Sequence, residues 1–198
     1  IKFKSPFTLF NIPSTINGEY KRIPFSFVSF GNPSIPKDIQ GLSTNLKMIF
    51  LNNQIMINMG YNNSNDNVND YKLSTTTSSS YNVGINLNFN KLPNINYSIK
   101  DLSRRDNIGL INNRTITHTF TPIYKFNLLN LKIGLNNNLV LMNYEDLKSS
   151  IIDTLNNNFQ QLSLSHSNSL STKRLSINTG LGISKNIPGN ITKEETQF

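Results

Sequence analysis

The sequence predicts an all-β protein, an antiparallel up-and-down meander of about eight long strands that forms a transmembrane β-barrel or part of one. Three observations predict it. Apolar and polar residues alternate with a period of two over long segments. The polar positions of these segments hold Asn, Ser, Thr and Gly far more often than charged residues. Short turn-like connections alternate with longer polar ones, which is the layout of consecutive hairpins.

The alternation is clearest at residues 81–90, where every second side chain is apolar and the others are Asn or Gly. No helical period gives this arrangement. Residues 94–100 and 175–183 repeat it. Together the three segments are expected to place one apolar, lipid-facing set of side chains on a common face: Tyr81, Val83, Ile85, Leu87, Phe89, Ile95, Tyr97, Ile99, Leu175, Ile177, Leu181 and Ile183.

Noisier versions of the pattern predict the remaining strands, at about 44–51, 55–61, 114–126, 130–144 and 158–170. Asn52-Asn53 suits a tight hairpin because Asn tolerates positive φ. Lys91-Leu92-Pro93 breaks the alternation between two strands. Longer polar connections are expected at 62–80, 106–113 and 145–157.

The chain divides into three predicted parts: an irregular loop with edge strands over 1–43, barrel strands over 44–186, and a polar tail over 187–198. Five prolines argue against long central strands in the first part, namely Pro6, Pro13, Pro24, Pro33 and Pro36. The opening residues lack an initiator Met and a small-residue cleavage site, so we do not expect a signal peptide there. A piece of a longer protein is the interpretation that the sequence favours.

Composition narrows the class of protein. Only 36% of residues are hydrophobic and 15% are charged, while the net charge is +8. The cations are dispersed near turns and form no stripe interleaved with aromatic residues, so no nucleic-acid partner is expected. The chain has no cysteine, which excludes disulfides and thiolate metal sites. It also has no run of about 18 apolar residues, which excludes a transmembrane helix.

Strand length, the uncharged polar face and aromatic placement favour a membrane barrel. Globular strands average about 5 or 6 residues, whereas a tilted strand needs about 9 to 11 to cross a bilayer, as these segments could. Aromatic residues that cluster near strand ends are typical of interfacial girdles, and those of this chain are Tyr61, Tyr81, Phe89, Tyr124, Phe126, Tyr144 and Phe159. Outer-membrane lipid is therefore the expected partner. The alternative is a soluble or secreted β-sandwich binding module, adhesin-like, whose core the same apolar residues would fill.

A resemblance points the same way. Patterned segments of this chain are Ser64-Asn65-Asp66-Asn67, Thr75-Thr76-Thr77, 81–90, Leu92-Pro93, Ile95-Asn96-Tyr97-Ser98 and Arg104-Arg105-Asp106-Asn107. They cover about a third of the sequence and resemble strand-and-loop patterns of large, uncharacterised outer-membrane β-barrel proteins of Gram-negative bacteria. The resemblance implies a location in the cell outer membrane and no catalytic residues. Together with the strand pattern, it leads us to expect a non-enzymatic barrel with a structural, pore-forming or transport role.

Few side chains of this sequence could support catalytic or metal-binding chemistry. His118 and His166 fall on apolar faces, and their i+2 residues, Phe120 and Asn168, cannot act as nucleophiles in the manner of an outer-membrane phospholipase. Two histidines without a carboxylate cluster also make a poor metal site. Asp66 and Asp70 lie in an Asn-rich loop that could attract Ca²⁺ but lacks the spacing of a calcium loop. We therefore expect no catalytic residue, no metal site and no cofactor; a barrel enzyme is the third-ranked hypothesis.

Overall fold

A computed structural model gives ten strands and describes residues 1–27, 38–89, 92–129, 131–147, 158–172 and 175–188. The strands are β1 (Lys2–Leu9), β2 (Ile12–Ile23), β3 (Ile39–Phe50), β4 (Ile55–Asp66), β5 (Thr76–Leu87), β6 (Asn94–Asp106), β7 (Asn112–Leu128), β8 (Leu131–Asp146), β9 (Phe159–Ser171) and β10 (Ser176–Pro188). The predicted all-β class is confirmed. The expected count of about eight strands is wrong, because the sheet contains ten.

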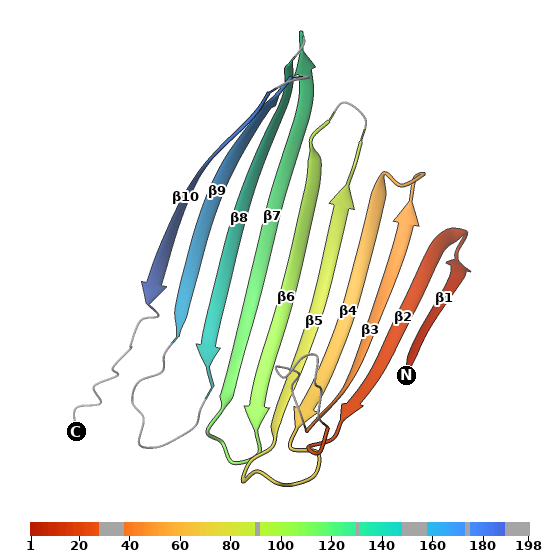
Figure 1. The fold of residues 1–198 in the computed structure, drawn as a ribbon, viewed down its shortest axis with the longest axis vertical. Coiled ribbons are helices and arrows are strands. Elements are labelled where there is room, and N and C mark those ends of the chain that lie inside the picture. The colour runs from red at the N-terminus through yellow and green to blue at the C-terminus, as the bar shows by residue number, and fades with distance from the viewer. Residues whose placement is uncertain (28–37, 90–91, 130, 148–157, 173–174, 189–198) are drawn as a thin grey trace, which may run out of the picture.

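All ten strands belong to one open sheet, in which each strand pairs antiparallel with its neighbour along the chain. This is the predicted up-and-down meander (Figure 1). Short turns at one end alternate with longer connections at the other. The short turns step along the sheet from β1 to β7, so the strands are staggered rather than aligned at a common level (Figure 1).

Because the cross-strand register is regular, the alternation of apolar and polar residues within each strand continues across the whole sheet. Val83 of β5 lies opposite Met59 of β4 and Ile99 of β6, whereas its neighbour Asn82 lies opposite Gly60 and Lys100. Directly opposed residues point to the same side of a sheet. The sheet therefore has an apolar face, which includes Val83, and a polar face, which includes Asn82.

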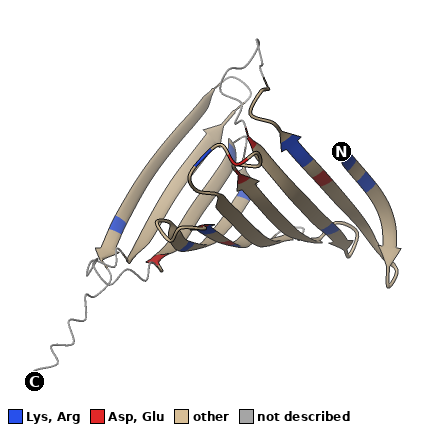
Figure 2. Ribbon diagram, turned by 90° about the horizontal axis from the view of Figure 1, so that it is seen from below, with Lys and Arg blue, Asp and Glu red and all other residues tan. Residues whose placement is uncertain are grey.

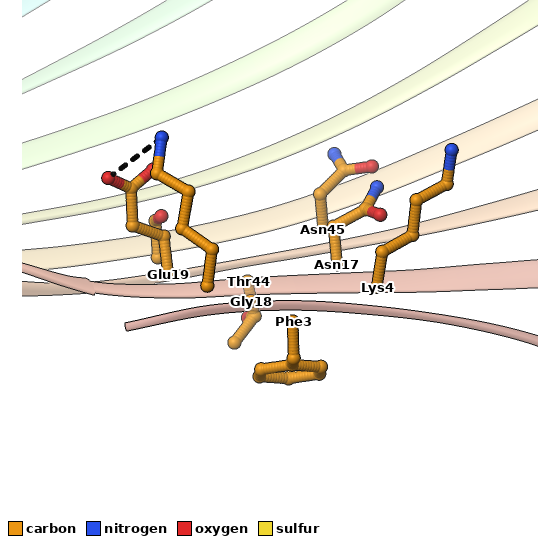
Figure 3. Close-up of a pocket in the computed structure, with 9 residues that line it drawn as sticks. Phe3, Lys4, Asn17, Gly18, Glu19, Thr44 and Asn45 are labelled. Carbon is orange, nitrogen blue, oxygen red and sulfur yellow. Dashed lines mark ion pairs between the residues drawn. The ribbon is translucent and has the colours of Figure 1, made fainter.

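The sheet is curved, as the view along its length shows (Figure 2). At the β1 edge, Lys4, Asn17 and Asn45 point to the side on which the other strands rise, and Phe3 points to the opposite side (Figure 3). The polar face is therefore the concave one and the apolar face the convex one. Strong twist and coiling of this kind are the normal consequence of pairing many long antiparallel strands.

The region 1–43, which the sequence suggested to be irregular with edge strands, contains β1, β2 and the start of β3. Two prolines lie within its first hairpin. Pro6 is in β1, an edge strand that pairs only with β2. Pro13 precedes Ser14, the residue at which β2 begins to pair with β3. Both prolines thus occupy positions where a sheet tolerates the missing N–H group. Of the tail 187–198, residues 187 and 188 belong to β10, and the rest lies outside the described residues.

Several strands also extend beyond their predicted ends. β4 continues to Asp66 and β5 begins at Thr76, so the predicted loop 62–80 is shorter than expected. In these extensions Asn, Ser and Thr occupy both faces, and a period of two leaves no hydropathy signal. β5 ends at Leu87, so Phe89 lies in the turn before β6, where its carbonyl accepts a hydrogen bond from the Leu92 N–H (3.3 Å).

One interior ladder is interrupted at a proline. The β7–β8 pairs run to Phe120–Leu139 and resume at Ile123–Asn136 with the register unchanged, leaving Thr121 and Pro122 without backbone pairing to β8. Pro122 lacks the N–H group that an interior strand donates. A side-chain hydrogen bond crosses the gap instead, from Thr121 Oγ1 to Asn138 Oδ1 (2.8 Å).

The turn between β3 and β4 contains three consecutive residues with positive φ: Leu51 (49°), Asn52 (52°) and Asn53 (71°). The two asparagines match the predicted tight hairpin, since Asn enters the left-handed region more readily than most residues. Leu51 does not share this preference, and its exposed side chain gains no burial in return. Leu51 is therefore a strained residue of the turn.

Replacing Leu51 with Asn should relieve this strain and raise the free energy of unfolding by roughly 0.5–1 kcal/mol. Leu51→Val should lower it by roughly 1 kcal/mol, because a β-branched residue is poorly tolerated at positive φ. Urea titration with an unchanged m-value measures both differences. Equal midpoints for the two variants would contradict the left-handed turn.

Candidate functional site

The candidate functional surface is the apolar face of the sheet, and the predicted lipid-facing residues on the strands all lie on it. Val83, Ile85 and Leu87 of β5 lie opposite Ile99, Tyr97 and Ile95 of β6, respectively. The residues predicted in β10 join the same face, because Ile183 lies opposite Leu164 of β9 and Leu164 lies opposite Leu139 of β8. Leu175 precedes the first residue of β10.

Nothing in the described residues covers this face. Val83 is 42% exposed and Ile183 is 75% exposed, although both belong to regular strands. Ile23, at 8%, is the buried hydrophobic residue among those the structure describes. Soluble monomers rarely leave a contiguous apolar patch of this extent in water, so such a surface normally marks contact with a membrane or another protein.

Sequence reasoning missed part of the face. Register adds apolar residues of β2, β3, β4, β8 and β9 that were not among the predicted lipid-facing set: Ile16, Leu46, Met48, Phe50, Ile55, Ile57, Met59, Leu139, Leu141, Leu162 and Leu164. In β4 the signal was blurred by Met56, which lies on the polar face beside two apolar-face isoleucines. Cross-strand pairing, rather than periodicity within one strand, identifies these residues.

The apolar band ends near the row of Tyr61 toward the long connections, with Tyr20 and Leu42 one row beyond it. Tyr61 and Tyr81 lie opposite each other there, with ring centroids 4.9 Å apart. The same row continues to Asp101 of β6, whose carboxylate accepts hydrogen bonds from Arg114 Nε (3.1 Å) and Nη2 (2.6 Å). Ring residues followed at once by charged ones are typical of a boundary between hydrocarbon and water.

The height of the band follows from strand geometry. In β4 it extends from Ile55 at the short turn to Tyr61 at the boundary, a rise of about 20 Å at roughly 3.3 Å per residue. At the tilt of about 35–45° usual for barrel strands, this rise would correspond to a height of about 15 Å, which is less than the apolar band of about 25 Å around a membrane barrel.

The predicted aromatic girdle needs one correction. Tyr144 of β8 and Phe159 of β9 stack on each other with ring centroids 5.0 Å apart, but they lie on the polar face. In β8 the residues Val140 and Met142 also occupy that face, so apolar side chains locally occupy both sides of the strand. Tyr124 and Phe126, by contrast, lie on the apolar face, where their centroids are 5.3 Å apart.

Each histidine lies on the apolar face with a polar partner. His118 Nδ1 is 3.0 Å from Tyr97 Oη, on the neighbouring strand. His166 Nδ1 is 2.6 Å from Asn137 Oδ1, its direct cross-strand partner. Neither contact supplies a serine, a cysteine or a carboxylate, and the two imidazoles belong to strands that are not adjacent. Each contact gives the Nδ1 atom of its ring a polar partner.

The Asn-rich connection between β4 and β5 uses its oxygens internally. Asp66 accepts hydrogen bonds from the Thr76 N–H (2.6 Å) and from Lys72 Nζ (2.9 Å). The Asn67 side chain makes two hydrogen bonds to the backbone of Lys72. Its Oδ1 accepts one from the Lys72 N–H (2.7 Å), and its Nδ2 donates one to the Lys72 carbonyl (3.0 Å). No group of three potential metal ligands occurs within the described ranges. The loop is therefore closed by the chain's own donors.

Burial of Asp66 favours its neutral form and would raise its pKa, but the hydrogen bonds from Lys72 and Thr76 and the positive charge of Lys72 prevail, so the pKa is lowered from 3.8. Asp66 lies beyond the apolar band, at the last position of β4. A carboxylate whose pKa falls on folding stabilises the fold above its unfolded pKa, and this contribution is lost as the pH falls through the folded pKa.

We expect pepsin to cleave the loop faster, at Tyr71 or Leu73, as the pH falls below about 4, because protonated Asp66 releases Lys72. Asp66→Asn should remove this pH dependence and leave the loop easily cleaved throughout. Asp70→Asn, which removes another carboxylate from the same loop, should preserve it. Cleavage rates normalised to an unstructured peptide provide the measurement, and a wild-type rate independent of pH would contradict the expectation.

Comparison with known proteins adds no family assignment: no protein-family model, curated protein or solved structure matches this chain. Among the residues described, no helix is long and apolar enough to cross a membrane. The functional argument therefore depends on the two faces of the sheet.

Proposed function

We propose that this chain forms part of the wall of a β-barrel in the outer membrane of a Gram-negative bacterium, with a structural, pore-forming or transport role and no enzymatic activity. The observation that carries the proposal is the exposed apolar face. It is continuous across all ten strands, and no described segment packs on it. Lipid chains on the convex side and water on the concave side would satisfy both faces at once.

The two unpaired edges of the sheet support a second part of the proposal, which concerns the size of the barrel. Every residue of β1 and of β10 is exposed, and the two strands lie at opposite sides of the sheet (Figures 1 and 2). An unpaired backbone group in hydrocarbon costs several kcal/mol, so a membrane sheet must close on itself. We propose that further strands pair with β1 and β10 and complete a barrel larger than these ten strands.

The alternative function, an adhesin-like β-sandwich module, would require a second sheet. A sandwich buries its apolar face against another sheet about 10 Å away. All strands of the described residues belong to a single sheet instead. The resemblance of segments such as Tyr81–Asn90 and Arg104–Asn107 to outer-membrane barrel patterns supports the first proposal over the second.

Adjacent residues on opposite faces allow a direct test. The chain has no native cysteine, so single cysteines can be introduced at Val83 and at Asn82 and labelled with a polarity-sensitive fluorophore. After the labelled chain is reconstituted in phospholipid vesicles together with the strands that complete its barrel, the label at position 83 should be blue-shifted and quenched by lipid-borne nitroxides. The label at position 82 should instead be quenched by aqueous iodide, because neighbouring strand residues face opposite sides.

Two results would decide against the bilayer. If both labels were reached by iodide in vesicles, the apolar face would not contact lipid. If the protein stayed monomeric in detergent-free buffer with position 83 shielded, the apolar face would be covered by protein, as in the sandwich alternative. Heat-modifiable gel mobility of the unlabelled chain provides an independent check for a folded barrel.

A further inference from the structure

The carboxylates of the polar face are confined to one end of it, whereas its cations also include Lys21 and Arg104 toward the long connections and Lys125 and Lys132 toward the short turns. These carboxylates all lie toward the long connections: Glu19, Asp66, Asp106 and Asp146. Glu19 pairs with Lys2 (3.4 Å) and Asp66 with Lys72 (2.9 Å). Across the middle of the face the charged side chains are Lys4, Lys47 and Lys100, which we call the lysine tier.

Register places Lys4 and Lys100 in one row. Starting from Lys4 in β1, successive partners across the sheet are Asn17, Asn45, Gly60, Asn82, Lys100, Thr117, Met142, Gln161 and Asn186. Apart from the two lysines, the glycine and the methionine, every member carries an amide or hydroxyl group. Figure 3 shows one end of this row, where Lys4 points into the concave side together with Asn17 and Asn45.

Lys47 lies in the next row of the same face, two residues away along the strand. It is opposite Thr15 of β2 and Asn58 of β4, and the row continues through Gly84, Ser98 and Thr119. No carboxylate occurs in either row. Within the described part of the chain no salt bridge engages the ammonium group of a tier lysine.

The spacing of the three lysines and the curvature of the sheet let their electrostatic potentials act together. Neighbouring strands are about 4.8 Å apart and two residues rise about 6.7 Å, so across the sheet the backbone positions of Lys4 and Lys47 are separated by about 12 Å and those of Lys47 and Lys100 by about 16 Å. These separations are comparable to the Debye length of about 10 Å at 0.1 M salt, so the three potentials overlap. On a concave surface the side chains converge. The surrounding amide groups supply further hydrogen-bond donors to an anion.

We propose that the lysine tier is a binding and selectivity site for small hydrated anions in the aqueous interior of the barrel. The inference depends on the proposed function for its setting, since it requires the concave face to line water. Rings of Lys and Arg confer anion preference on a pore because they raise the local anion concentration and lower that of cations. Inorganic polyphosphates, with several charges per molecule, should bind more tightly than chloride.

Binding to the refolded protein in non-ionic detergent at low salt tests the site without requiring a pore. Inorganic pyrophosphate, titrated calorimetrically, should bind the wild type with an affinity that falls steeply as salt is added. The triple variant K4Q/K47Q/K100Q should bind at least about tenfold more weakly. The triple arginine variant should retain binding, and a wild-type strand signal in circular dichroism shows that each variant folds.

Lys185→Gln is the matched control. Lys185 lies on β10 opposite Leu162, on the apolar face and between the heights of the two tier rows. Its removal changes the net charge without touching the concave face, so pyrophosphate affinity should change less than about twofold. Equal binding by wild type and the triple glutamine variant would overturn the proposal, and so would an equal loss in Lys185→Gln.

Planar bilayers then separate this inference from the proposed function. Under a KCl gradient the current through the wild type should have a reversal potential of the sign expected for chloride selectivity. The reversal potential of the triple glutamine variant should shift toward the value expected for potassium selectivity. Tier-dependent pyrophosphate binding without membrane insertion would support the anion site and overturn the barrel. Insertion with cation preference in the wild type would support the barrel and overturn the anion site.

Discussion

The rest of the structure depends on one constraint: the register of every strand pair places apolar-face positions opposite apolar-face positions. A slip of one residue between any two strands would move a whole set of Ile, Leu and Val side chains to the other side of the sheet. Because register is kept through all nine pairings, the short apolar stretches of single strands combine into one continuous surface. The amide- and hydroxyl-bearing residues combine into the opposite surface in the same way.

The two faces explain how a chain with so few hydrophobic residues can be ordered. A soluble domain needs apolar residues on both sides of a core, whereas a single layer needs them on only one side. Curvature then separates the environments: the crowded concave side carries small Ser, Thr, Gly and Asn, and the convex side carries the larger Leu, Ile and Phe. Small residues on the inner side also let neighbouring strands coil without steric conflict.

Much of the fold was predictable from the sequence, and the failures share a cause. Segments 81–87 and 176–183 alternate with few or no exceptions, so strands were predicted correctly there, and their apolar residues share one face of the sheet. The first hairpin was obscured by Pro6 and Pro13, whose acceptability depends on which neighbours pair with them. Extensions such as 62–66 are polar on both faces and give no periodic signal. The lysine tier was invisible because Lys4, Lys47 and Lys100 are far apart in sequence, and register alone aligns them.

The interruption at Pro122 has a mechanical consequence. It lies between β1–β7 on one side and β8–β10 on the other, so the ladder that joins these two groups has fewer backbone rungs than its length suggests. The β7–β8 ladder still has more paired residues than any other ladder of the sheet, so the gap weakens it only locally, where the Thr121–Asn138 hydrogen bond joins the two strands. The gap at Thr121 and Pro122 therefore permits a local bend in the sheet, while the paired segments on either side keep their alignment.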